Sequence, residues 1–272
     1  DAIPGLNSFV LYFALPCMLY RFGSTTPIGQ LLDPGVFFTY LLCALVLVGF
    51  VVTVSMNRRI GWNDAAFGAL VAAFPNTGFM GVPLLVALLG AAAAGPAIAT
   101  IMVDLLVTSS LCVALSRLDG AGAHGFAVAG RNALRGVLVN PMPWAILLGA
   151  LASYLGLTLP GPANQAVGLL ADAASPVALF TIGAVLARSQ MIVPVDGAHP
   201  LPMRDYIPVA VIKLVLHPVL VLLVGIGAIQ LGVPLDRFAL TVMVLIAALP
   251  SASNVSLLAE RFGADNGRIA RI

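Results

Sequence analysis

Residues 72–85 read AAFPNTGFMGVPLL, and this stretch decides how the chain folds. Two prolines and two glycines interrupt a run of residues that is otherwise apolar and helical in character. Pro75 has no N–H and its ring crowds the carbonyl of Val71, so a helix must bend or break there. In hydrocarbon, unpaired backbone is tolerated only where protein or a water-filled cavity satisfies it. The stretch therefore predicts a broken helix beside a polar site.

Composition places that helix in a lipid bilayer. Of the 272 residues, 60% are apolar and 9% are charged, and the mean hydropathy is +1.05. Soluble domains average about 45–50% apolar and about 25% charged residues. We expect an all-α polytopic membrane protein, because alternating patterns typical of barrel strands are absent.

Eight apolar segments are long enough for full spans, each of which needs about 20 helical residues. They cover approximately 6–22, 35–56, 65–89, 95–116, 137–156, 163–187, 207–231 and 236–262. A ninth segment begins near Asn266 and is cut at Ile272. Cys17, Cys43 and Cys112 all lie in apolar stretches, which favours small core residues over disulfides or a metal site.

The positive charges of the loops predict how the chain is oriented across the membrane. Ten arginines lie in alternate loops, against only Arg21 and Arg237 on the other side. The ten are Arg58, Arg59, Arg117, Arg131, Arg135, Arg188, Arg204, Arg261, Arg268 and Arg271. Because positive loops stay cytoplasmic, segment one runs outward and the loops at 118–135 and 189–206 face the cytoplasm. A multi-pass protein of a bacterial inner membrane is the expected localisation.

The sequence also contains an internal repeat. Residues 247–258 read AALPSASNVSLL, so the short sequence motif around Pro250 matches the motif around Pro75. A weaker match relates segment one, around Pro16, to segment six, around Pro176. By the charge rule the paired segments run in opposite directions, as in the inverted repeats of secondary transporters. This predicts two crossing broken helices in a five-plus-five arrangement.

The predicted organisation has three parts. Residues 1–118 form a first repeat that lacks its first helix, 119–136 form a cytoplasmic linker, and 137–272 form a second repeat with a truncated last helix. Completing the symmetry requires one helix before Asp1 and one continuing beyond Ile272.

Polar residues follow both breaks, which favours a binding site over two ordinary proline kinks packed in a bundle. Half-helix N-termini there would present free N–H groups and a partial positive charge, suited to an anion. The predicted substrate-binding residues are Pro75, Asn76, Thr77, Gly78, Pro250, Ser251, Ser253 and Asn254.

Four ionisable residues fall within the predicted spans: Asp104, Asp172, Lys213 and His217. Placing an ionisable side chain inside a bilayer costs free energy, so such residues usually have a functional role. An Asp104–Lys213 ion pair could simply join two helices; alternatively, Lys213 offsets a substrate carboxylate or Asp104 takes up a coupling proton. His217 precedes Pro218 and either bonds a freed carbonyl or carries a proton. A polar cavity is expected around Asp172.

The stretch from Phe74 to Leu85 resembles the first crossover of the auxin efflux carrier family, which includes plant auxin exporters and bacterial malonate-type carriers. Gly5-Leu6-Asn7 leading to Ala14-Leu15-Pro16 is similar to that family's second helix, and Asn140-Pro141 and the 250–263 stretch also fit. The resemblance implies a ten-helix homodimeric carrier in which one block moves against a scaffold. Segments one, five and six correspond to that scaffold, and Asn76 to a substrate contact.

Composition and motifs weigh against other classes. Neither a His-Glu-x-x-His nor a Gly-x-Gly-Asp motif occurs, so an intramembrane enzyme is disfavoured, and no ATP-binding Gly-x-x-x-x-Gly-Lys loop is present. A channel or sensor remains the other alternative. The expected partners are a small organic anion, the bilayer and a coupling proton or sodium ion, with no cofactor, no metal and no nucleic acid.

Overall fold

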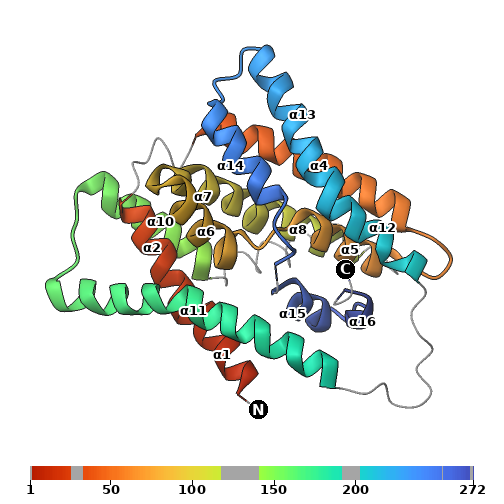
Figure 1. Cartoon of the computed structure of the whole chain (residues 1–272), viewed down its shortest axis with the longest axis horizontal. Helices are drawn as coiled ribbons and strands as arrows, with labels where there is room; N and C mark the ends of the chain where they lie inside the picture. Colours follow the sequence, from red (N-terminus) through yellow and green to blue (C-terminus); the bar gives the residue numbers. More distant parts are fainter. Residues whose placement is uncertain (1, 26–32, 118–140, 192–202, 253, 270–271) are drawn as a thin grey trace. The chain divides into compact units, whose positions relative to one another are not determined.

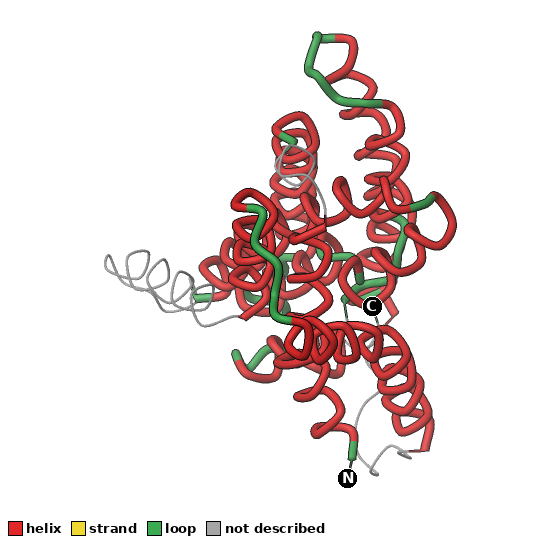
Figure 2. The backbone as a smooth tube through the Cα atoms, turned by 90° about the vertical axis from the view of Figure 1, so that its left-hand side faces the viewer, coloured by secondary structure: helices red, strands yellow, loops and turns green. Residues whose placement is uncertain are grey.

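The computed structural model describes residues 2–25, 33–117, 141–191, 203–252, 254–269 and 272. Within these ranges every regular element is a helix, and the only strand-like pairing is one isolated bridge (Figures 1 and 2). The all-α class is thus confirmed for the described part of the chain. The predicted cytoplasmic loops fall mostly outside it, in the stretches 118–140 and 192–202.

Contacts divide the chain into two compact units. Unit 1 comprises Asp1–Leu31, Gly78–Gly95 and Asn140–Pro200, and unit 2 comprises Leu32–Thr77, Pro96–Val139 and Leu201–Ile272. Unit 1 therefore gathers segments one, five and six, together with the half of segment three that follows its break.

Unit 1 contains short helices from the first 93 residues and two longer helices from the middle of the chain. These are α1 (Ile3–Phe9), the π-helical turn η1 (Val10–Ala14), α2 (Leu15–Thr25), α6 (Val82–Leu89), the 3-10 turn η3 (Ala91–Ala93), α10 (Pro141–Leu155) and α11 (Gly161–Met191). Helix α2 packs on α10 and α11. A Cβ added to Gly23 would lie 2.9 Å from the Ile146 carbonyl oxygen, so a small residue is required where α2 meets α10.

Unit 2 holds most of the buried core. Its helices are α4 (Pro34–Ser55), α5 (Trp62–Ala73), α8 (Ser109–Ser116), α12 (Ile207–Val211), α13 (His217–Gln230), α14 (Arg237–Ala247), α15 (Asn254–Arg261), α16 (Asn266–Ile269) and most of α7 (Ala94–Val103). Shorter turns are η4 (Asp104–Thr108), η5 (Met203–Asp205) and η6 (Ile212–Leu216), while η2 (Thr77–Gly81) begins at the unit boundary.

The long apolar helix α4 is central to this core. It starts where Asp33 accepts hydrogen bonds from the N–H groups of Gly35 and Val36, with Pro34 in the first turn. It packs against α5, α13 and α14. A shared set of buried residues joins α4 to α7, α13 and α14: Val36, Tyr40, Cys43, Ala44, Ala99, Val103, Val221, Leu235, Ala239, Leu240, Met243 and Ala247.

Three stretches of the described chain are long and apolar enough to cross a membrane: Pro34–Ser55, Ala91–Ser116 and Ile207–Gln230. Shorter apolar helices cover Thr77–Leu89, Trp144–Leu155 and Arg237–Ala247. Segments three and eight are each interrupted, which is why their pieces fall below the length of a full span.

Candidate functional site

The first break lies where the sequence places Pro75. Helix α5 ends at Ala73, and helical structure resumes at Thr77. In an unbroken helix the Val71 carbonyl would accept from the residue four positions on, but that residue is Pro75, which has no N–H. The hydroxyl of Ser251 donates to the Val71 carbonyl instead, at 2.7 Å. A side chain of the second break therefore satisfies the backbone freed by the first.

The two breaks are joined through their backbones. Pro75 and Ser251 form an isolated antiparallel bridge. The Asn76 N–H donates to the Pro250 carbonyl at 2.8 Å, and the Ala252 N–H donates to the Phe74 carbonyl at 3.0 Å. The two breaks therefore meet inside unit 2; we call this meeting point the crossover, comprising residues 74–77 and 248–252.

Asn76 and Thr77 lie in the interior of the crossover. Asn76 is 3% exposed and its Oδ1 has no hydrogen-bond partner in the described part of the chain. Thr77 is fully buried, and its hydroxyl donates to the Pro75 carbonyl at 3.4 Å. A buried amide oxygen without a partner costs about 1–3 kcal/mol, so this acceptor is a natural point for a ligand or water to bind.

A buried cation stands beside the second break. Lys213 lies in η6 and is 1% exposed. Its Nζ donates to the carbonyl of Ala247, the last residue of α14, at 3.1 Å, and lies 3.2 Å from Nδ1 of His217. His217 is fully buried one helical turn later, and its Nε2 has no hydrogen-bond partner in the described residues, although the ring interacts with the backbone of Ala72.

Asp104 is fully buried at the start of η4. Its carboxylate accepts from the Tyr40 hydroxyl at 3.3 Å and from the Thr108 hydroxyl at 3.1 Å. The Tyr40 ring lies 6.1 Å from the His217 ring, centroid to centroid. Asp104 and Lys213 thus belong to one buried polar group, and each sits in a π-helical turn, a feature frequent at functional sites.

Of the alternatives left open for Asp104 and Lys213, a direct ion pair between the two side chains does not occur in the structure. No nitrogen–oxygen approach within 4.0 Å joins the two described side chains; each is held by other groups, although their charges interact. An ion pair was one possible way to neutralise both charges. The sequence alone does not show that Tyr40 and a freed helix-end carbonyl offer closer partners.

Asp172 is also placed differently from the prediction of a polar cavity. It lies on α11 in unit 1, where its carboxylate accepts from the Arg21 guanidinium at 2.7 Å. Their side chains are 69% and 38% exposed respectively. The pair is therefore a largely exposed ion pair of unit 1.

The remaining predicted residues have mixed placements. Gly78 begins the portion of unit 1 that follows the first break, and a Cβ there would lie 3.7 Å from Leu15. Asn254 is the first residue of α15. Ser253 lies outside the described residues.

A second buried cation was not anticipated. Arg268 is 2% exposed; its Nε donates to the Asp205 carbonyl at 2.7 Å and its Nη1 to the Asp64 carbonyl at 2.8 Å. Burial lowers the pKa of Arg268, while the charges of Asp64, Asp205 and Asp265 act in the opposite direction. The position of Arg268 in the sequence indicates only a cytoplasmic loop charge, because its partners are distant in sequence.

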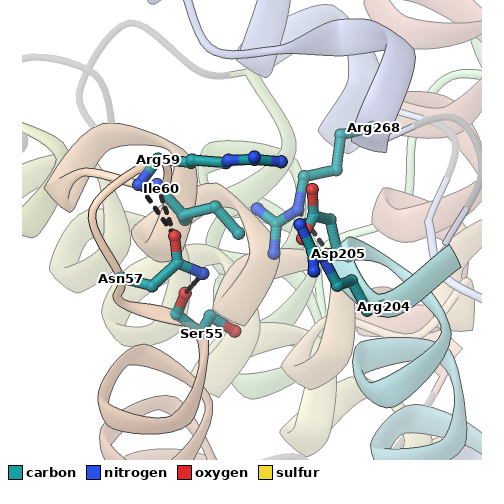
Figure 3. A network of polar contacts seen from close by, with 7 residues as sticks. All are labelled: Ser55, Asn57, Arg59, Ile60, Arg204, Asp205 and Arg268. Atoms are coloured by element: carbon teal, nitrogen blue, oxygen red, sulfur yellow. Dashed lines mark hydrogen bonds and ion pairs between the residues drawn. The ribbon is translucent and has the colours of Figure 1, made fainter. Parts of the chain in front are cut away.

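Neighbouring turns complete this end cluster, which we define as Asp64, Asp205, Asp265 and Arg268. Figure 3 shows Arg268 beside Asp205, which also lies 3.9 Å from the Arg204 guanidinium. In the same view the Asn57 side chain accepts from the N–H groups of Arg59 and Ile60 at 2.8 and 3.1 Å and so shapes the turn after α4. The end cluster joins the start of α5 to the segments before α12 and at α16.

Chemically, the described residues offer polar groups for binding rather than a metal centre. No group of three or more His, Cys, Asp or Glu side chains that could hold a metal occurs within the described ranges. A buried meeting point of two broken helices, in a chain with apolar spans, is the arrangement of a membrane transport protein.

Comparison with known proteins agrees with that class. The family model described as "Membrane transport protein" matches residues 1–121 and 125–272, so the chain belongs to this family. This confirms the resemblance to the auxin efflux carrier family and identifies a membrane transporter rather than an enzyme.

Two relatives illustrate the similarity. A Rhizobium meliloti (strain 1021) protein named "Putative malonate transporter" is 28% identical over 265 residues, which cover 97% of this chain and 79% of that protein. The "Uncharacterized transporter YfdV" of Escherichia coli (strain K12) is 28% identical over 200 residues, covering 73% of this chain and 59% of its own length.

Proposed function

We propose that this protein is a secondary transporter that moves a small organic anion, such as a carboxylate, across a bacterial inner membrane. The single observation that carries the proposal is the crossover, where two broken helices meet beside the buried Asn76 side chain, whose Oδ1 has no partner in the described residues. Half-helices that begin after each break supply free N–H groups and a partial positive charge, which suit an anionic substrate.

The charges of unit 2 support an anionic substrate. Lys213 contributes a positive charge at the end of α14, and Asn76 offers its amide one break away. The name of the Rhizobium relative includes malonate, a small dicarboxylate, and we extend that substrate class to this chain as part of the proposal.

The proposed mechanism is alternating access with an elevator-like motion. The intact architecture would consist of two inverted repeats of five helices, with the eight predicted segments spanning the bilayer. The part that carries the crossover would move as a block, and segments one, five and six would form a homodimeric scaffold. Asp104, Lys213 and His217 are the candidates for ion coupling.

Counterflow in proteoliposomes tests the transport class. Purified protein is reconstituted with an unlabelled dicarboxylate inside, and uptake of labelled malonate, succinate, acetate and indole-3-acetate is followed. A carrier predicts uptake that is accelerated by substrate on the opposite side. Uptake without this acceleration would indicate a channel, and no uptake of any carboxylate would refute the substrate class.

The topology is tested separately, on residues exposed in the structure. In a background without cysteine, Arg59→Cys should react with an impermeant maleimide only in permeabilised cells, whereas Leu231→Cys, at a site 87% exposed, should react in intact cells. The reverse pattern would refute the predicted orientation.

A further inference from the structure

The C-terminal end of α14 has an unusual partner. In an unbroken helix the Ala247 carbonyl would accept the N–H of Ser251, four residues on. The break at Pro250 instead directs Ser251 into the bridge with Pro75. The Ala247 carbonyl is left without its helical donor, and the Lys213 ammonium donates to it at 3.1 Å.

In carriers with broken helices, the C-terminal end of a half-helix is a place where a cation can bind. Unwound carbonyls and the C-terminal ends of half-helices carry partial negative charge, and they are where such proteins hold a coupling cation. At the other break the freed Val71 carbonyl is satisfied by a neutral hydroxyl. The Ala247 carbonyl, next to the crossover, is instead contacted by the ammonium of Lys213.

We propose that Lys213 is a tethered cation that occupies the place of a coupling sodium ion, so that substrate binding and transport do not require sodium. The inference rests on the proposed transport function and adds its ion dependence. It is carried by the direct contact of Nζ with a helix-end carbonyl and by the almost complete burial of the side chain.

Among the described residues, the group whose charge acts on Lys213 is the carboxyl of Asp104. Because Lys213 donates to Nδ1 of His217, that ring nitrogen accepts, and the ring is neutral with its proton on Nε2. Tyr40 approaches from α4 as a neutral phenol. A sodium ion added at the Ala247 carbonyl would meet the side-chain nitrogen of Lys213, which already occupies that carbonyl.

The first test needs no substrate. The melting temperature of the purified full chain is measured in sodium chloride and in choline chloride at equal ionic strength. We expect the same melting temperature in both salts, because no sodium ion binds. A saturable rise in sodium would overturn the inference, and this arm remains decisive even if no carboxylate is transported.

The second test uses counterflow and a charge-removing variant. Wild-type counterflow should be equal in sodium and in choline; stimulation by sodium would overturn the inference. Lys213→Gln keeps a hydrogen-bond donor but removes the charge, and should lower counterflow in choline at least tenfold. Wild-type counterflow in choline by this variant would show that the charge is dispensable.

A matched control removes a positive charge from the first residue of α14, the helix whose last carbonyl Lys213 contacts. Arg237→Gln alters the exposed first residue of α14 and should retain wild-type counterflow in both salts. Failure of wild-type counterflow with every carboxylate would count against the proposed function, whereas sodium dependence would count only against the tethered cation.

Discussion

Two buried cations of unit 2, Lys213 and Arg268, satisfy backbone carbonyls in very different surroundings. Arg268 bonds two carbonyls and interacts with three aspartates, so its charge is well compensated. Lys213 bonds one carbonyl and a histidine, and the only carboxylate charge that acts on it in the described chain belongs to Asp104, which bonds elsewhere. The comparison separates a cation on which three aspartates act from one on which a single carboxyl group acts.

The largest expected effect is on folding, at the end cluster. Arg268→Ala removes two hydrogen bonds from a charged donor, each worth about 1.5–3 kcal/mol, so the free energy of unfolding should fall by about 3–6 kcal/mol. Thermal and denaturant unfolding of the purified protein measures this loss. Arg59→Ala, at an exposed position of the neighbouring turn, is the control and should change stability by less than about 0.5 kcal/mol. Equal stability of both variants would contradict the structural role of Arg268.

A smaller effect is expected at the crossover from Ser251→Ala. The substitution leaves the buried Val71 carbonyl without its donor and should cost about 1–3 kcal/mol of stability. Ser251→Thr retains a hydroxyl and should recover most of the loss in melting temperature. If the alanine variant melts like wild type, the Ser251 hydroxyl does not replace the missing proline N–H.

The smallest effect is expected at the ion pair of unit 1. An ion pair that water reaches contributes about 0–1 kcal/mol, so if water reaches this pair, Arg21→Gln and Asp172→Asn should each change stability by no more than this. A double-mutant cycle in low and high salt measures the coupling, which should shrink as salt rises. Loss of transport in Asp172→Asn with unchanged stability would instead return Asp172 to the set of coupling residues.

The sequence predicted the features that depend on local chemistry. A proline without an N–H breaks a helix wherever it stands in its interior, so the interruptions near Pro75 and Pro250 could be read directly. The apolar composition likewise required helices in a bilayer, since lipid supplies no partner for open backbone.

The partners of the freed groups could not be predicted, because they depend on contacts across the fold. Ser251 and Val71 are 180 residues apart, and Arg268 and Asp64 are 204 apart. Lys213 and Asp104 looked like a pair because their charges are opposite, but charge alone does not specify geometry. Arg21 and Asp172 pair across 151 residues, which made Asp172 resemble an isolated intramembrane acid.

The substitution Asn76→Ala tests whether the crossover binds the substrate. The Asn76 side chain is buried, and its Oδ1 has no partner in the described chain, so the fold gains little from the amide. Asn76→Ala keeps the proline break and removes only the donor and acceptor. A hydrogen bond to a charged group is worth about 1.5–3 kcal/mol, which corresponds to a loss of affinity of roughly tenfold or more.

The measurement is calorimetric titration of the purified full-length protein with the carboxylate that gives the strongest counterflow, together with its melting temperature. The account predicts at least a tenfold weaker affinity in Asn76→Ala with a melting temperature close to that of wild type. Unchanged affinity, or a parallel fall of affinity and melting temperature, would show that Asn76 is structural and that the substrate binds elsewhere.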